Sequence, residues 1–428
     1  MLRHLYSLAL LAAVPFMLLR LWLKSLSIPG YRQNIGQRFG AVPTSGSSAN
    51  VSGESPVIWI HAVSVGETVA AAPLVKALLD KEHRPTIFFT TTTATGAARA
   101  RSLFKESVIH SYSPYDLGFV MRKFLSRLRP RLLILMETEL WPNMLHYCER
   151  FGVKVLLANG RMSAKSAAGY GKIAGLTRQM LQHIDHIAVQ AVADAERFEA
   201  LGASPGQLSV TGSLKFIIDD INSQQSPSLL FKSIKGAGRP VIIAASTREG
   251  EEEKVLSAIR PLMHRSPTPL LLLVPRHPER FDKVEQLCMN QNLTIQRRSN
   301  SESLNDQTQV ILGDSMGEML AYYSLANIAF VGGSLVDTGC QNVLEPAAMG
   351  LPVVVGPSQY NFATICAQLE KAGALLTVTD SAALTDALAK LLDDANARSE
   401  MGRAGREVVE KNQQALPLLM EKISELIN

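Results

Sequence analysis

The chain has 428 residues, of which 46% are hydrophobic and 19% are charged. This composition excludes an intrinsically disordered chain and a small disulfide-stabilised scaffold, and the length allows two domains that each bury a core. The formal net charge of +5 is modest, and no nucleic-acid partner is expected. The four cysteines have no C-x-x-C spacing, so we expect free thiols and neither a zinc cluster nor a disulfide framework.

The N-terminal segment from Leu5 to Leu23 is almost entirely apolar and has about the length needed to cross a membrane. Residues 1–24 are therefore predicted to form a membrane anchor, although a helix lying in the membrane interface and kinked at Pro15 stays open. No small-residue cleavage site follows, which disfavours a signal peptide. Basic residues gather after the apolar segment, so the positive-inside rule places the rest of the chain on the cytoplasmic side.

Residues 41–55 are rich in serine and glycine and are predicted to form a loop. After them, short apolar runs alternate with helical patterns, beginning near residues 57, 86, 132, 153, 186 and 208. This alternation specifies a parallel sheet with helices on both faces. Residues 25–221 are thus predicted to form a doubly wound Rossmann-like domain, and the polar, Gly/Pro-containing residues 222–239 are predicted to be a linker.

The same pattern restarts after the linker, with apolar runs near residues 241, 270, 310, 328 and 352. Residues 240–428 are predicted to form a second Rossmann-like domain, whose last helix is a candidate to pack back on the first domain. The expected fold class is therefore α/β, with two doubly wound domains facing a cleft and an N-terminal anchor helix. Ligands of such sheets bind beyond the carboxyl ends of the strands.

Glu67 is the first candidate for chemistry, because it follows an apolar strand at this edge of the predicted sheet. Ser64 and Glu67 also have the S-x-x-E spacing of a helix capping box, so the carboxylate could serve the helix alone. A general base that takes a proton from an attacking hydroxyl is the functional alternative. The spacing by itself favours the cap.

Three further candidates lie in the second predicted domain. Arg276 emerges after Pro275 at a strand end, and guanidinium groups suit phosphate. Gly317 permits close backbone approach before Glu318 begins a helix. A glycine-rich strand end at 332–333 precedes a helix expected to begin near Asn342. Backbone N–H groups at that helix start could hold phosphate, and Glu345 could bind ribose hydroxyls. The structural alternative is that Asn342 and Glu345 only cap the helix.

Other reaction classes lack their motifs. The chain has no P-loop, no H-E-x-x-H and no G-x-S-x-G, and the first strand-to-helix turn lacks the dinucleotide fingerprint. His277 has no second ligand at useful spacing, so no metal site is expected. The acidic residues 249 and 251–253 are expected to decorate a helix N-terminus.

Several motifs, taken in order, resemble one known family, the Kdo transferases, which move 3-deoxy-manno-octulosonate from CMP-Kdo to the lipid A precursor. The matching segments are RQNIGQRFG, HAVSVGET, METELWPN, ANGRMS, GSLKF, VPRHPER, DSMGEM and NVLEPAAMGLPVVVGP. The resemblance implies an inverting glycosyltransferase of the GT-B type on the cytoplasmic leaflet of the inner membrane, without cofactor or metal. It makes Glu67 the catalytic base. It also assigns the CMP-binding residues Pro275, Arg276, Met316, Gly317, Glu318, Asn342, Val343, Leu344 and Glu345.

The chain departs from the family pattern at two places. Gly339, Cys340 and Gln341 precede Asn342 where the family commonly reads G-G-H-N, and Arg248 stands where a histidine is more usual. Two alternatives stay open at this point: an enzyme that uses a UDP-sugar, and a membrane-anchored binding protein in which Glu67 is only a cap. The number of Kdo units, the acyl chains of the acceptor and the oligomeric state are not fixed by the sequence. The basic stretch from Arg99 to Arg131 is a candidate to meet the acceptor's phosphates.

Overall fold

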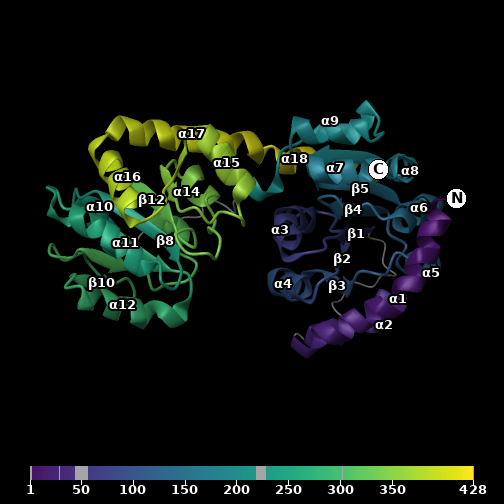
Figure 1. Cartoon of the computed structure of the whole chain (residues 1–428), viewed down its shortest axis with the longest axis horizontal. Coiled ribbons are helices and arrows are strands. Elements are labelled where there is room, and N and C mark those ends of the chain that lie inside the picture. The colour runs from purple at the N-terminus through teal and green to yellow at the C-terminus, as the bar shows by residue number, and fades with distance from the viewer. Residues whose placement is uncertain (1, 28, 44–55, 218–227, 301, 428) are drawn as a thin grey trace. The chain divides into compact units, whose positions relative to one another are not determined.

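A computed structural model of the chain describes residues 2–27, 29–43, 56–217, 228–300 and 302–427. The chain folds into two compact units (Figure 1). Unit 1 comprises Met1–Ile217 together with Asn412–Asn428, and unit 2 comprises Ile218–Lys411. The predicted loop 41–55 lies largely outside the described residues, as does the first part of the predicted linker.

The N-terminal helix α1 (Leu2–Ser27) continues through Pro15 and packs against helices α6 and α8 of unit 1. Within the described part of the chain it is the one helix long and apolar enough to cross a membrane. Its outer side exposes large apolar side chains such as Leu8, Phe16 and Trp22. Two short helices follow it, η1 (Pro29–Arg32) and α2 (Ile35–Arg38).

Unit 1 is built on a parallel seven-stranded sheet with the order β3-β2-β1-β4-β5-β6-β7. Its strands are β1 (Val57–His61), β2 (Thr86–Thr91), β3 (Ile109–Tyr112), β4 (Leu132–Met136), β5 (Lys154–Gly160), β6 (His186–Val189) and β7 (Leu208–Val210). Its other helices are α3 (Val65–Leu79), α4 (Ala94–Phe104), η2 (Lys105–Ser107), α5 (Gly118–Leu128), α6 (Pro142–Arg150), α7 (Ala164–Gly171), α8 (Ala174–Gln182), α9 (Val192–Ala200), η3 (Pro205–Gln207), η4 (Leu214–Phe216) and α18 (Ala415–Ile427).

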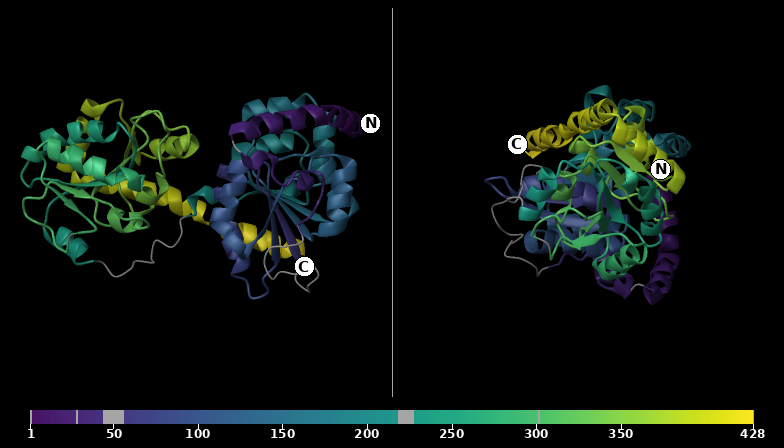
Figure 2. Two further views of the ribbon diagram at one scale, coloured as in Figure 1. Left: turned by 90° about the horizontal axis from the view of Figure 1, so that it is seen from below. Right: turned by 90° about the vertical axis from the view of Figure 1, so that its left-hand side faces the viewer.

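The central strand β1 shows why helices cover both faces of this sheet. All five of its residues are buried, and consecutive side chains alternate between two cores. Trp59 lies in the core shared with α5, α6 and α8, whereas Ile58 and Ile60 lie in the core shared with α3 and α18. Figure 2 shows α1 and α18 on different sides of this sheet. A strand buried on both faces requires the continuous apolar run that the sequence carries.

Unit 2 is built on a second parallel seven-stranded sheet, with the order β10-β11-β9-β8-β12-β13-β14. Its strands are β8 (Val241–Thr247), β9 (Leu270–Pro275), β10 (Ile295–Arg297), β11 (Val310–Leu312), β12 (Ile328–Val331), β13 (Val353–Val355) and β14 (Leu375–Thr377). Its helices are α10 (Leu229–Gly236), α11 (Glu252–Ile259), η5 (Arg260–His264), η6 (Pro278–Arg280), α12 (Phe281–Asn290), α13 (Met319–Tyr323), α14 (Leu344–Ala348), α15 (Ala363–Lys371), α16 (Ser381–Asp393) and α17 (Ala395–Gln413).

The predicted fold class is confirmed, since both units are parallel α/β sheets covered by helices. The prediction of a linker over residues 222–239 is wrong for its second half, because those residues form most of α10. Leu230, Phe231 and Ile234 of α10 are buried against the sheet of unit 2, so this segment is part of that unit. The C-terminal helix α18 belongs to unit 1, where it contacts α3 and β5.

Candidate active site

The strand order of unit 1 changes direction between β1 and β4, which pair in parallel at the middle of the sheet. Ligands of doubly wound sheets bind beyond the carboxyl ends of the strands at such a switch point. Glu67 lies in the first turn of α3, directly after β1. Glu137 and Glu139 follow β4 directly. Three acidic side chains therefore converge at the place where this fold binds its ligands.

Glu67 is held by a network at the start of α3. Ser64 is the N-cap residue, and its Oγ accepts the backbone N–H of Glu67 at 3.4 Å and donates to Glu67 Oε1 at 2.8 Å. Glu67 Oε2 accepts the backbone N–H of Val63 at 2.6 Å. The predicted cap is therefore present, except that the carboxylate reaches the N–H of Val63 instead of that of Ser64. The helix begins at Val65, directly after its cap.

The surroundings of Glu67 raise its affinity for a proton. Burial is the main cause of its raised pKa, and the charge of Glu137 adds to it. Hydrogen bonds from Val63 and Ser64 and the charge of Lys215 act in the opposite direction. Burial and the charge of Glu67 likewise raise the pKa of Glu139 to about 7. A carboxylate with raised proton affinity suits a general base, which must accept a proton near neutral pH.

Glu137, Glu139 and Lys215 were given no role by the sequence analysis. Lys215, in η4, forms an ion pair with Glu137 at 3.0 Å. Glu137 has a φ of 58°, a left-handed conformation that is uncommon for a residue other than glycine and that clusters at functional sites. The position of Glu137 and Glu139 immediately after a fully buried strand could have revealed them as candidate site residues. The ion pair with Lys215 could not be predicted, because it depends on the folded topology.

In unit 2 the structure brings Arg276, Asn342 and Glu345 together. Arg276 is exposed and follows β9, and its charge opposes the burial that raises the pKa of Glu345. Asn342 Nδ2 donates to Glu345 Oε1 at 2.9 Å, and Asn342 Oδ1 accepts the N–H of Leu344 at 3.0 Å. The expected N-cap at Asn342 is displaced by one residue, because Val343 is the N-cap residue of α14.

The remaining predicted residues of unit 2 lie around the same helix. Met316 is exposed, Gly317 has a φ of 83°, and Glu318 pairs with Arg298 at 3.0 Å. They precede α13, which packs against α14, so the two predicted segments are neighbours. Pro275 ends β9. The side chains of Pro275, Val343 and Leu344 are buried, so they belong to the packing of unit 2 and not to its exposed surface.

The acidic run lies at the N-terminus of α11 as predicted, with Glu251 as the N-cap residue and Glu252 and Glu253 in the first turn. The prediction did not anticipate the burial of Glu251 and Glu252. Both side chains are fully buried. Glu251 Oε1 accepts the backbone N–H groups of Ser334 at 3.0 Å and Leu335 at 2.9 Å, and its Oε2 accepts those of Gly333 at 2.6 Å and Arg248 at 3.1 Å. The N–H groups of the glycine-rich turn are therefore occupied by a carboxylate of the protein itself.

Arg248, one of the departures from the family pattern, lies beside the predicted phosphate-binding residue. It follows β8, which neighbours β9, and its Nη1 donates to Nε2 of His277, the residue next to Arg276. The substitution thus places a second guanidinium at this strand end. Guanidinium groups bind phosphate through paired N–H donors.

A cluster of possible metal ligands escaped the sequence analysis, which expected no metal site. His146, Glu149 and His183 each place a ligand atom within 4.8 Å of the others. They lie on α6 and at the end of α8. Helical spacing brings His146 and Glu149 to one face of α6, but the approach of His183 depends on the packing of two helices, which spacing alone cannot predict.

The comparisons with known proteins first define the class. UDP-GlcNAc 2-epimerase from Neisseria meningitidis bound to UDP-GlcNAc superposes with a TM-score of 0.54 at 12% identity, over 86% of this chain and 100% of that one. This likeness shows the fold. Residues 288–408 match the family described as glycosyl transferases group 1. The chain has the α/β two-domain fold of a glycosyltransferase.

The family follows from the N-terminal half and from the curated relatives. Residues 33–218 match the family described as 3-deoxy-D-manno-octulosonic-acid transferase (kdotransferase). The 3-deoxy-D-manno-octulosonic acid transferase of Haemophilus influenzae is 41% identical over 98% of this chain and 97% of its own length. That of Bordetella pertussis is 38% identical over 94% of each chain. The chain belongs to the 3-deoxy-D-manno-octulosonic acid (Kdo) transferase family.

Proposed function

We propose that the protein transfers Kdo from CMP-Kdo to the lipid A precursor, an acylated and phosphorylated glucosamine disaccharide, with inversion at the anomeric carbon. The observation that carries this proposal is the buried carboxyl of Glu67, with its raised pKa, at the switch point of unit 1. A chain of this family needs a base at its acceptor, and Glu67 has both the position and the proton affinity for that role.

In the proposed reaction Glu67 removes the proton of an acceptor hydroxyl as its oxygen attacks the anomeric carbon of Kdo. The bond from that carbon to the phosphate oxygen of CMP breaks, and CMP leaves with the electron pair. The hydrogen bonds from Val63 and Ser64 hold the carboxylate in one orientation before the substrate arrives. Such preorganisation lowers the barrier because no group has to be reoriented during the reaction.

Unit 2 is proposed to bind the donor. Arg276, assisted by Arg248, would stabilise the charge on the departing phosphate, because guanidinium groups bind phosphate strongly. Glu345, oriented by Asn342, would accept hydrogen bonds from ribose hydroxyls. The segment from Met316 to Glu318 would close the cytidine side of the site. The occupation of the glycine-turn N–H groups by Glu251 favours these side chains over the turn as the phosphate ligands.

We also propose that α1 attaches the enzyme to the cytoplasmic face of the inner membrane. The helix exposes Leu8, Phe16 and Trp22 on one side and packs on unit 1 with the other. Burial of these exposed apolar side chains in lipid removes them from water, which is favourable. Replacing these three residues by glutamine should release the protein from vesicles of anionic lipid in a flotation assay, whereas unchanged flotation would contradict the attachment.

The test of the proposed function is product formation by the full chain, followed by mass spectrometry. CMP-Kdo and a tetraacylated lipid A precursor should yield products heavier by one or more Kdo residues, and the same spectrum counts the sugars. UDP-GlcNAc is offered in a parallel reaction. Turnover of the UDP-sugar without turnover of CMP-Kdo would overturn the assignment, as would a folded protein that turns over neither.

A further inference from the structure

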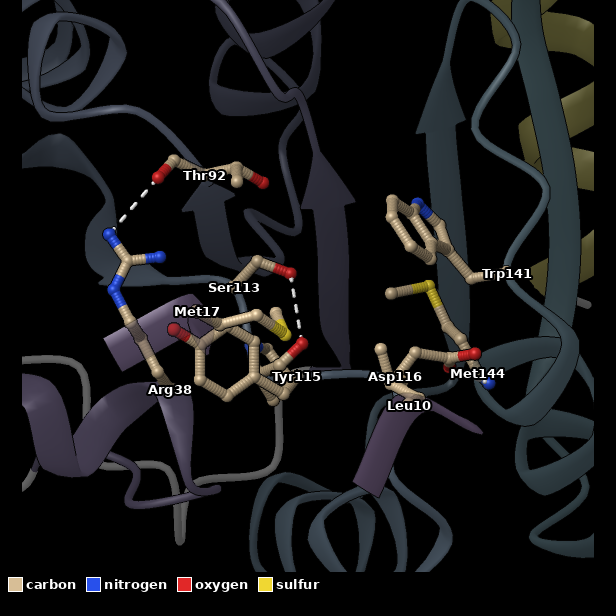
Figure 3. A pocket seen from close by; sticks show the side chains of 10 residues that line it. Leu10, Met17, Arg38, Thr92, Ser113, Tyr115, Asp116, Trp141 and Met144 are labelled. Carbon is tan, nitrogen blue, oxygen red and sulfur yellow. Dashed lines mark hydrogen bonds between the residues drawn. The ribbon is translucent and has the colours of Figure 1, made fainter. Parts of the chain in front are cut away.

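Unit 1 contains a cavity of about 100 Å³ at the carboxyl ends of β2 and β3 (Figure 3). Leu10 and Met17 of α1 form one wall, and Thr92, Ser113 and Met144 belong to the others. The cavity has room for a phosphoryl-sized group, because a single water molecule needs only about 10–15 Å³ of such volume. It can therefore hold one substituent of a larger ligand.

Arg38 provides the charge in this cavity. Its side chain is 1% exposed, its Nη2 donates to the carbonyl oxygen of Thr92 at 3.0 Å, and its guanidinium lies 4.3 Å from the ring centre of Tyr112. Its Nε has no hydrogen-bond partner. Among the residues that the structure describes, no carboxylate forms an ion pair with Arg38. Burial of an unpaired cation is costly, so the site is incomplete without an anion.

Asp116 also lines the cavity but does not neutralise Arg38. Its two carboxylate oxygens accept the backbone N–H groups of Asn143 at 3.0 Å and Met144 at 2.6 Å, at the start of α6. The carboxylate is thus used to hold the first turn of that helix. The cavity keeps an uncompensated positive charge on the side of Arg38.

The cavity adjoins the acidic cluster on two sides. The N–H of Thr92 donates to the carbonyl oxygen of Val63 at 3.3 Å, and Val63 in turn holds Glu67. On the other side Trp141, which also lines the cavity, donates from Nε1 to Glu139 Oε2 at 2.9 Å. A ligand with its anionic group on Arg38 would therefore place neighbouring atoms close to the proposed base.

We propose that this cavity binds a phosphoryl group of the acylated acceptor, with Arg38 as its ligand. The apolar wall from α1 continues toward the exposed side of the same helix, where acyl chains can remain in the membrane. The inference rests on the proposed function, because it assigns the acceptor of that reaction to a site. The cavity differs from the basic stretch Arg99–Arg131. The basic side chains of that stretch are exposed to solvent, so unlike Arg38 they need no anion to compensate for burial.

The test compares Arg38→Gln with the wild-type chain on the phosphorylated acceptor and on the same acceptor after removal of its phosphoryl groups. Loss of a charged hydrogen bond should raise the KM for the phosphorylated acceptor about 10- to 100-fold. The KM for CMP-Kdo and the kinetics on the dephosphorylated acceptor should stay unchanged. The control is Arg84→Gln, an exposed arginine between α3 and β2, which should change neither KM. Equal losses on both acceptors would overturn the proposal.

Two further variants guard against a merely structural role for Arg38. Met17→Trp fills the cavity and leaves the guanidinium in place, so it should raise the KM for the phosphorylated acceptor selectively. Arg38→Lys keeps the charge but loses the planar fork, and it should restore part of the affinity. If Arg38→Gln fails to fold, unchanged acceptor kinetics in Met17→Trp would contradict the proposal.

Ligand-induced thermal stabilisation separates failure of this inference from failure of the proposed function. If the wild type turns over no CMP-Kdo, the proposed function is wrong. Binding of the phosphorylated acceptor to the cavity can still be tested by the change in melting temperature. The phosphorylated acceptor should raise the Tm of the wild type but not of Arg38→Gln. Equal stabilisation of both proteins, or stabilisation of the wild type by inorganic phosphate alone to the same extent, would exclude the acceptor lipid as occupant.

Discussion

The charges around Glu67 act in opposite directions on the same proton. Glu137 raises the pKa of Glu67, whereas Lys215 lowers it. The two side chains also pair with each other at 3.0 Å, so each moderates the effect of the other. The balance between them should set the pH at which Glu67, as the proposed base, becomes active.

This balance predicts opposite shifts in the pH profile of kcat. Since the base works deprotonated, activity is lost as the pH falls through the pKa of Glu67. Glu137→Gln removes a negative charge, so the pKa should fall and the acidic limb should move to lower pH. Lys215→Met removes a positive charge and should move the limb to higher pH. Shifts in the same direction for both variants would contradict the assignment of Glu67 as the titrating base.

The burial of Glu251 and its hydrogen bonds to the glycine-rich turn could not be predicted from the sequence. The sequence places it among four acids near a helix start, where exposure is the usual outcome. Its partners, Gly333 to Leu335, lie more than 80 positions away and meet it because β8 and β12 pair in the sheet. The cap of Ser64 and Glu67, by contrast, spans three residues and could be predicted.

Glu251 also provides a stability prediction. Glu251→Ala leaves four backbone N–H groups without their carboxylate, and each buried unsatisfied donor is costly. We expect the free energy of unfolding to fall by about 1–3 kcal/mol or more. The matched control is Glu253→Ala, which alters an exposed side chain of the same run and should change stability by less than about 0.5 kcal/mol. Equal effects in urea unfolding would show that the carboxylate does not hold the turn.

At the scale of elements, the strands missed by sequence are β3, β10 and β14. Each lies at an edge of its sheet. The edge strand β3 includes His110, and β10 contributes only three partly exposed residues. Edge strands are short and polar on the side that has no neighbour, so they lack the continuous apolar run that reveals a central strand such as β1.

The helix α18 closes one face of the unit 1 sheet, and this packing is open to a direct test. Leu419 is fully buried in the core with α3 and β5, whereas its neighbour Leu418 is 39% exposed. Leu419→Ala should lower the free energy of unfolding by about 2–5 kcal/mol because it leaves a cavity. Leu418→Ala should cost less than about 0.5 kcal/mol in the same urea titration. Similar losses would contradict the docking of α18 on unit 1.

At the scale of the whole molecule, the chain crosses between its units twice, since its last residues return to unit 1. Unit 1 holds the acidic cluster, the cavity beside α1 and the apolar helix α1 itself, all of which are proposed to serve the acceptor. Unit 2 holds the arginine-rich strand ends proposed for the donor. The division into two units was predictable from the single restart of the strand pattern after the linker. The packing of α18 on unit 1 was only a candidate, because an amphipathic helix does not reveal its partner.

The measurement that tests the account most directly is transfer of Kdo by Glu67→Gln, with Glu82→Gln, an exposed residue, as the control. Glutamine preserves the shape at Glu67 but cannot accept the proton, so kcat should fall by about 10²- to 10⁴-fold while the KM for CMP-Kdo and the Tm stay close to wild type. Glu82→Gln should behave as the wild type. Near-normal turnover by Glu67→Gln would contradict the central claim and reduce Glu67 to a helix cap.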